Sequence, residues 1–484
     1  MYKGEFSLST MLDASRVYAV ALLLLAWVGM SLSSVKAADI IAEGGCTLSQ
    51  AIESANQDRA VGGCVAGNGA DNIELASDIT LTAELPAITS PISIMGGGFA
   101  INGENRFRIF FVDEDGDLSI ESLTLRNGAA QAEARICIDW DPGEWTAGGA
   151  ICNLGALSVS ASRFSGNGAE FGGAIASVGA VTINYSDFGG NTARSGGALI
   201  NWIDGKMTIE GGIFSGNTAT RDESLLDPDS KEDSEKTLAE NPIYFDGDGG
   251  AIANALRGEI SITGSEFSDN EADLAAGAIL NHGNLEILGS QFANNSAYGG
   301  GGAFLSGENT LTTVTDSSFN GNSTWLGGAI ESWGILLIVD SRFHDNFAVR
   351  GGAIRVTGQS TVSITGSRFS DNSASDSGGA IFNCVYCELT AVDSVFSGNS
   401  ARLRGGAIFG YGTVSISGGI FSRNRAGDLG GAIINLGTLQ LTDSEFTLNR
   451  AVKGGGIYND RDNVVEQDNN YYSDNRGGDC TRCD

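Results

Sequence analysis

Eight cysteines carry the most reactive side chains of the chain, and they fall into four close pairs. The pairs are Cys46 with Cys64, Cys137 with Cys152, Cys384 with Cys387, and Cys480 with Cys483. In an oxidising compartment such pairs form disulfides, here as local clips on turns and insertions. Zinc binding and disulfide exchange are the alternatives for the two Cys-x-x-Cys pairs, but no neighbouring histidine or helix supports either.

Chemistry on sugars would require carboxylates that flank a cleft, or a Ca²⁺ site with a basic residue beside it. Glu331 and Arg355 occupy the same position of two neighbouring repeats, which predicts an exposed salt bridge rather than a catalytic pair. Neither His282 nor His344 has the partners of a triad or of a metal site. The sequence therefore predicts no catalytic residue.

One acidic cluster is a candidate for Ca²⁺. It surrounds Gly116 and consists of Asp113, Glu114, Asp115 and Asp117. The cluster lacks the glycine position of an EF-hand loop, and we interpret it as a solvated turn. The sequence thus predicts no resident metal and no cofactor, with Ca²⁺ as the single alternative.

Aromatic residues give the best binding candidate. Tyr298, Trp325 and Phe347 fall between a recurring Asn and the next glycine pair, where most repeats carry small or charged residues. Stacked repeats would align them in a stripe that holds sugar rings or an apolar protein patch, with Trp333 nearby. The alternative is that these aromatics only cover a corner of the core. The predicted partner is an extracellular glycan or a surface protein.

Twelve copies of Gly-Gly-Ala-Ile, or a close variant, must position these residues. Each copy is followed by an aromatic residue and then by an Asn three residues later, as in Phe343 with Asn346, and the period is 24 to 27 residues. Such periods are typical of stacked repeats that share one continuous core. The copies begin at Gly148, Gly172, Gly196, Gly249, Ala276, Gly301, Gly327, Gly351, Gly378, Gly405, Gly430 and Gly454.

The spacing within the repeat indicates strands. The glycine pair and the aromatic residue are 16 or 18 residues apart, never 17. A two-residue change keeps every side chain on its own face of a strand, whereas a one-residue change would reverse them all. The predicted fold is therefore all-β, a single-stranded right-handed parallel β-helix of about 12 or more coils with an N-terminal cap.

The combination of Gly-Gly-Ala-Ile with Phe-x-x-Asn resembles the repeat of chlamydial-type polymorphic outer membrane proteins over residues 148 to 475. The segment Cys46-Thr47-Leu48-Ser49-Gln50-Ala51-Ile52 resembles a bacterial family named for its Cys-Ser-Leu-Arg-Glu-Ala signature, although Thr replaces Ser and Ser-Gln replaces Arg-Glu. These resemblances imply a pectin-lyase-like β-helix in a secreted or cell-envelope protein, and the first implies adhesion.

The chain divides into four predicted parts. Residues 1–37 read as a signal peptide, because the apolar run Val17 to Met30 precedes a small-x-small cleavage signal that ends at Ala37. Residues 38–90 form the cap, with an amphipathic helix from Thr47 to Asn56. Residues 91–475 form the β-helix, with a loop insertion at 221–248, and residues 476–484 are a cysteine-containing tail.

Charge restricts the partners. The formal net charge is −31, from 59 Asp and Glu residues against 28 Lys and Arg residues. Such a surface repels nucleic acid and anionic membranes, and no second apolar run predicts a span in the mature chain. The sequence favours a secreted or cell-surface protein, at the outer membrane surface or extracellular, with an adhesive or structural role and no catalysis. A polysaccharide lyase or glycoside hydrolase is the alternative.

Overall fold

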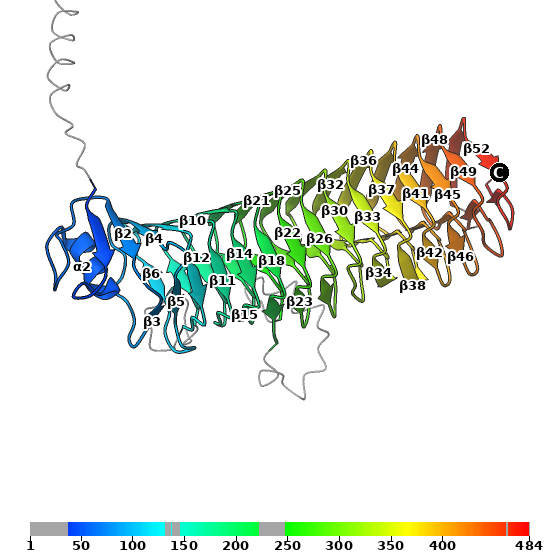
Figure 1. The fold of residues 1–484 in the computed structure, drawn as a ribbon. Helices are drawn as coiled ribbons and strands as arrows, with labels where there is room; N and C mark the ends of the chain where they lie inside the picture. The colour runs from blue at the N-terminus through cyan, green and yellow to red at the C-terminus, as the bar shows by residue number, and fades with distance from the viewer. Residues whose placement is uncertain (1–36, 131–136, 138–145, 222–246, 461–462, 484) are drawn as a thin grey trace, which may run out of the picture.

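The structure, a computed structural model, describes residues 37–130, 137, 146–221, 247–460 and 463–483. Within these ranges the chain is a straight rod of stacked coils (Figure 1). The predicted signal peptide, residues 1–37, lies outside the described residues except for Ala37, and so does most of the predicted insertion at 221–248.

Three long parallel sheets run the length of the rod. The first has 16 strands, from β1 (Asp39–Ala42) to β51 (Val464–Asp468). The second has 15 strands, from β3 (Ile79–Thr80) to β52 (Tyr471–Ser473), and the third has 14, from β6 (Phe110–Val112) to β53 (Cys480–Thr481). The predicted all-β parallel β-helix of 12 or more coils is confirmed, while its right-handedness remains a prediction.

One coil near the middle shows how the sequence makes each turn. β31 (Ile330–Ser332) belongs to the third sheet, β32 (Ile335–Val339) to the first, and β33 (Arg342–His344) to the second. A fourth strand, β34 (Phe347–Arg350), starts a short four-stranded sheet at the corner that leads to the next coil. Burial alternates along β32, as the spacing argument requires.

A column of aromatic rings fills the interior behind the second sheet. Consecutive rings stack with centroids 4.6–5.1 Å apart and interplanar angles of 3–13°. Since the rings stack along the rod, these distances also measure the rise from one coil to the next. The members are Phe164, Phe188, Phe214, Phe267, Phe292, Phe319, Phe343, Phe369, Phe396, Phe421, Phe446 and Tyr472.

The glycine pair is required by backbone geometry. Gly351, the first of its pair, has a φ of +68°, a conformation that other residues rarely adopt. A Cβ on the second, Gly352, would lie 2.1 Å from the carbonyl oxygen of Gly379 in the next coil. The repeated pair therefore allows neighbouring coils to approach at this corner.

A single helix, α2 (Leu48–Gln57), lies at the N-terminal end of the described rod (Figure 1). The Thr47 hydroxyl accepts a hydrogen bond from the backbone N–H of Gln50, and the Gln50 side-chain oxygen accepts one from the backbone N–H of Thr47, which stabilises the first turn. Leu48 and Ile52 are buried in the main core. The predicted amphipathic helix is present, and no helix among the described residues is long and apolar enough to span a bilayer.

His282 gives the fold one pH-dependent element. Burial at the turn between β24 (Ile279–Asn281) and β25 (Asn284–Leu288) lowers the pKa of His282 from its ordinary 6.5 to about 4. His282 therefore binds a proton below about pH 6.5 in the unfolded chain but only below about pH 4 in the folded chain. The free energy of unfolding thus decreases as the pH falls through this window.

We expect His282→Leu to remove this acid sensitivity, because the equivalent turn residue Leu154 is apolar. The urea midpoint should fall less between pH 7.5 and about 4.5 in the variant than in the natural chain. Val178→Leu, which changes the equivalent turn residue of another coil and carries no titrating group, is the control and should keep the natural pH dependence. Equal pH dependence in His282→Leu and the natural chain would contradict the assignment.

Candidate binding surface

A ladder of buried asparagines fixes the corner between the second and third sheets. In each coil the Asn side-chain amide donates to the Asn side-chain oxygen of the next coil at 2.9–3.0 Å. The same oxygen accepts a backbone N–H from the preceding coil, so the corner backbone is held rigidly. The ladder consists of Asn167, Asn191, Asn217, Asn270, Asn295, Asn322, Asn346, Asn372, Asn399, Asn424, Asn449 and Asn475.

Residues that follow the ladder alternate between the interior and the surface. The second residue after the Asn is a buried Ala in most coils, such as Ala348 and Ala401. The first and third residues therefore point outward. We call the outward residues at these two positions, from the coil of Asn295 to that of Asn475, the corner strip.

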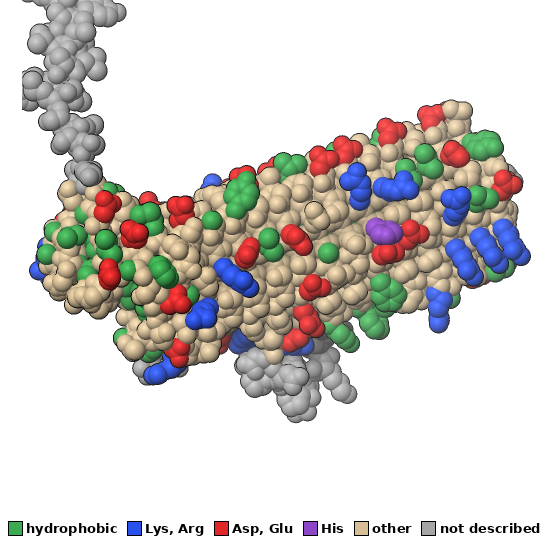
Figure 2. Space-filling view, in the orientation of Figure 1, with side chains coloured by type: hydrophobic (Ala, Val, Ile, Leu, Met, Phe, Trp, Pro, Cys, Tyr) green, Lys and Arg blue, Asp and Glu red, His purple; other side chains and the backbone are tan. Residues whose placement is uncertain are grey.

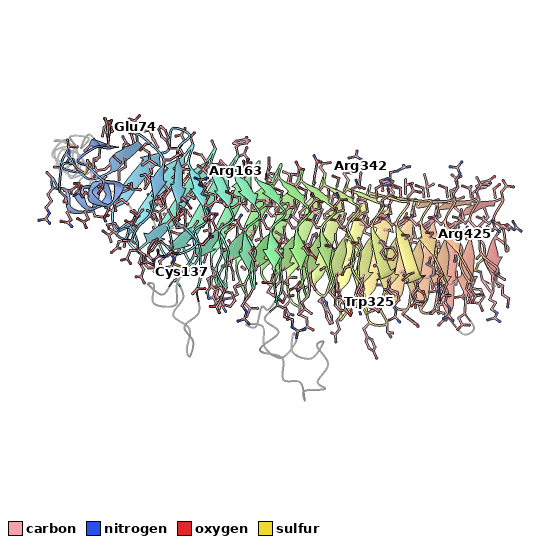
Figure 3. All side chains as sticks on the ribbon, turned by 60° about the horizontal axis from the view of Figure 1, so that its bottom comes forward. Glu74, Cys137, Arg163, Trp325, Arg342 and Arg425 are labelled. Carbon is pink, nitrogen blue, oxygen red and sulfur yellow. A yellow bond between two sulfur atoms is a disulfide. The ribbon has the colours of Figure 1, made fainter. Side chains whose placement is uncertain are left out.

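Three aromatic residues occupy the first three coils of the corner strip. Tyr298, Trp325 and Phe347 are 73%, 56% and 47% exposed. The rings of Tyr298 and Trp325 stack with centroids 6.4 Å apart and an interplanar angle of 28°. Figure 3 shows Trp325 at the edge of the rod. We call these three residues the aromatic patch.

Phe347 does not continue the column of the other two rings. It stands first after its ladder Asn, in register with Ser323, whereas Trp325 stands third after its own. Trp325 donates its backbone N–H to Tyr298 and accepts one from Val349, so Val349 is the residue that continues their column. Phe347 therefore lies diagonally across from Trp325 on the same outward face.

The structure does not bring Trp333 to the aromatic patch. Trp333 lies in the turn between β31 and β32, at the other end of β31 from Trp325. It is partly buried and packs against the cluster that contains Leu280 and Leu305. The prediction that Trp333 lies near the aromatic patch does not agree with this position, because β31 and the glycine pair separate Trp333 from Trp325.

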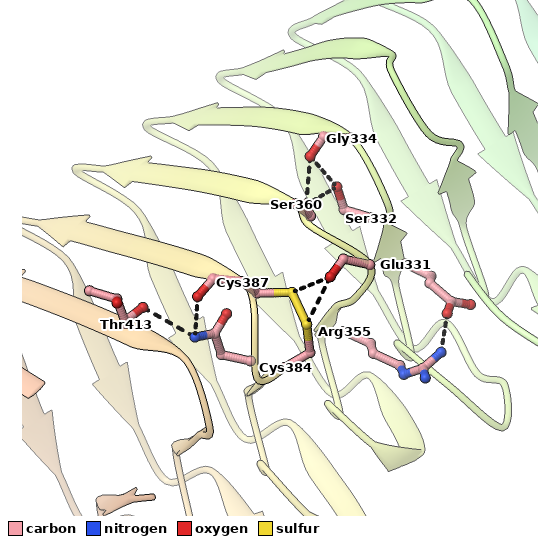
Figure 4. The surroundings of a disulfide bond; sticks show 10 residues. Glu331, Ser332, Gly334, Arg355, Ser360, Cys384, Cys387 and Thr413 are labelled. Atoms are coloured by element: carbon pink, nitrogen blue, oxygen red, sulfur yellow. Dashed lines mark hydrogen bonds and ion pairs between the residues drawn. A yellow bond between two sulfur atoms is a disulfide. The ribbon is translucent and has the colours of Figure 1, made fainter. Parts of the chain in front are cut away.

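Glu331 and Arg355 form the ion pair that their equal repeat positions predict (Figure 4). The prediction that this pair is exposed is wrong, because only 4% of the Glu331 side chain and 16% of the Arg355 side chain is accessible. Both lie in a row on the outer face of the third sheet where even Leu305 and Phe382 are only 8% exposed. Removal of either partner would leave an uncompensated buried charge.

Neither the cysteines nor the acidic cluster belongs to the corner strip. The four predicted pairs, Cys46–Cys64, Cys137–Cys152, Cys384–Cys387 and Cys480–Cys483, are disulfides in the structure. The acidic cluster lies at the turn between β6 and β7 (Asp117–Glu121). Within the described ranges, no group of three or more His, Cys, Asp or Glu residues is arranged to hold a metal ion.

The corner strip also carries a row of arginines that the sequence analysis did not predict. Arg425, Arg450 and Arg476 lie in register on three successive coils near the C-terminal end. Figure 2 shows Lys and Arg side chains gathered there. The available signal was the Asn-Arg pair that recurs in three consecutive repeats. We call these three residues the arginine column.

Comparison with known proteins gives one result for the repeat. No curated protein and no solved structure matches the chain. Residues 366–384 and 393–411 match the family model described as the Chlamydia polymorphic membrane protein repeat. The N-terminal segment from Cys46 to Ile52 lies outside these matches, so its resemblance to the second family remains a prediction. Over these two coils the chain carries the Chlamydia polymorphic membrane protein repeat.

Proposed function

We propose that this protein is a secreted or cell-surface β-helix protein that binds an extracellular glycan through the aromatic patch, without cleaving it. The name of the matched repeat supports a place at an outer membrane or cell surface. The four disulfides favour an oxidising compartment, which agrees with this location. An adhesive role follows if the glycan belongs to another cell.

The observation that carries the proposal is the exposure of three aromatic side chains on consecutive coils. In the coils next to Phe347 the outward residues of its column are small and polar, as at Ser296, Ser323 and Ser373. Exposed rings on a soluble rod need a reason, and the apolar faces of sugar rings suit flat aromatic side chains. The Asn ladder holds the backbone beneath them, so little order is lost when a ligand binds.

Replacement of Trp325 with alanine is expected to weaken glycan retention at least about tenfold, a loss of about 1.4 kcal/mol. The measurement is affinity electrophoresis of the purified protein against a panel of soluble polysaccharides. Tyr386→Ala is the matched control, since Tyr386 is 79% exposed in the Cys384–Cys387 turn. If both variants retain the natural mobility shift, the aromatic patch is not the binding site.

The same incubations also test catalysis. Newly formed reducing ends or unsaturated sugars should not accumulate in the natural protein. Their accumulation would contradict a purely binding role and would favour a polysaccharide lyase or glycoside hydrolase. Glu331→Gln would then be the first variant to assay, because Glu331 and Arg355 form the one carboxylate and arginine pair described on the outer face of the third sheet.

A further inference from the structure

The arginine column places three positive charges in a line. Bridges pair Arg425 with Arg450 and Arg450 with Arg476, and all three side chains are exposed. The rise between these coils is 4.7 and 5.1 Å, measured on the stacked rings behind them. Charges of one sign at this spacing repel one another in the free protein.

The arginine column has no acidic partner within ion-pair distance among the described residues. None of the three arginines is in an ion pair there, although acidic residues outnumber basic ones 59 to 28. Other outward arginines are paired across coils, as Arg257 is with Asp204 and Arg350 with Asp376. Other exposed arginines of the described chain, such as Arg163, Arg342 and Arg368, also lack an ion pair, so the column is distinguished by having three arginines in register on three successive coils.

Further positive charge lies on the same corner. Arg402, Arg404 and Lys453 are exposed between the ladder Asn and the glycine pair of their coils, and none of them forms an ion pair in the described part of the chain. Three acidic residues also lie on this corner: Asp376, which pairs with Arg350, Asp428, and Asp479, which accepts a hydrogen bond from the side chain of Asn475 at 3.0 Å. The local surface is thus basic on a protein whose net charge is −31.

The arginine column and the aromatic patch belong to one continuous strip. Phe347, Ser373, Ser400 and Arg425 follow one another in register. The two serines leave the path between the patch and the column unobstructed. Four coil steps of 4.6–4.9 Å separate the coil of Trp325 from that of Arg425, a distance of about 19 Å.

We propose that the corner strip binds an acidic polysaccharide laid along the rod axis, with sugar rings on the aromatic patch and carboxylates on the arginine column. This inference rests on the proposed glycan-binding function. The separation of patch and column requires an elongated ligand, and the planar guanidinium matches a carboxylate with two parallel hydrogen bonds. A line one residue wide suits a single polymer chain, whereas a membrane would contact a broad face.

The test compares the natural protein with a triple variant that carries Arg425→Ser, Arg450→Ser and Arg476→Ser. Serine is chosen because Ser373 and Ser400 occupy this column in neighbouring coils. The matched control removes three exposed arginines of the second sheet, Arg163→Ser, Arg342→Ser and Arg368→Ser, and changes the net charge equally. The probes are hyaluronan, alginate and the carboxyl-reduced neutral form of each.

We expect the natural protein to bind at least one acidic probe about tenfold more tightly than its neutral form. The triple variant should lose this preference and keep the neutral affinity, while the control should change neither. Added salt should weaken binding of the acidic probe in the natural protein and in the control.

The possible failures are distinguishable. Absence of binding to all four probes contradicts the proposed function itself. Neutral binding with no preference for the acidic form, or an unchanged preference in the triple variant, overturns only the inference. Binding of phosphatidylglycerol vesicles or single-stranded DNA as tightly as the acidic polysaccharide would also overturn it. Affinity for the acidic probe that Trp325→Ala leaves unchanged would show that one ligand does not span both sites.

Discussion

Replacement of Phe343 with alanine is expected to lower the free energy of unfolding by about 3–5 kcal/mol. The ring is fully buried and stacks on Phe319 and Phe369, with centroids 4.7 and 4.6 Å away. Truncation leaves a cavity that neither neighbour can fill, because each ring is itself held in register by the strands of the second sheet. Urea denaturation followed by circular dichroism measures the loss.

Two matched variants separate burial from ring chemistry. Phe347→Ala removes an exposed ring of the same coil and should change stability by less than about 0.5 kcal/mol. Phe343→Leu should cost less than alanine, because Leu125 occupies this column in an early coil. If Phe343→Ala and Phe347→Ala have the same free energy of unfolding, the aromatic column does not stabilise the fold as proposed.

The periodic part of the fold could be predicted from the sequence. The even spacing between the glycine pair and the aromatic residue preserves the face of every side chain, and that parity is what parallel coils in register require. The structure pairs Phe319 with Phe343 and Phe343 with Phe369 without a shift. The aromatic repeat was thus sufficient to predict strands, stacking and an interior column.

The burial of side chains and the corner at which each one lies could not be predicted in the same way. The sequence places Glu331 and Arg355 in register but does not reveal that the outer row of the third sheet is buried by its flanking corners. It also does not reveal that β31 places Trp333 and Trp325 at opposite corners of one coil. A linear repeat gives positions along the chain, whereas burial depends on the angle between successive sheets.

Replacement of the ladder residue Asn346 with alanine is expected to destabilise the fold by about 2–6 kcal/mol. The side-chain oxygen of Asn346 accepts the backbone N–H of Asn322 and one N–H of its amide, both at 3.0 Å. Its own amide donates to the carbonyl of Phe319 at 3.0 Å and to the side chain of Asn372 at 2.9 Å. Since Asn322, Asn346 and Asn372 are fully buried, water cannot replace these partners.

The destabilisation should be concentrated in the neighbouring coils, because a stacked repeat interacts only with its neighbours. Amide hydrogen exchange should therefore quicken first at the corner of Asn322, whose N–H groups lose their acceptor. Asn320→Ala is the control, because Asn320 is exposed and Ala293 holds its register position in the preceding coil. Unchanged exchange at Asn322 in Asn346→Ala would show that the ladder does not hold the corner, and the rigid support inferred beneath the aromatic patch would have to be abandoned.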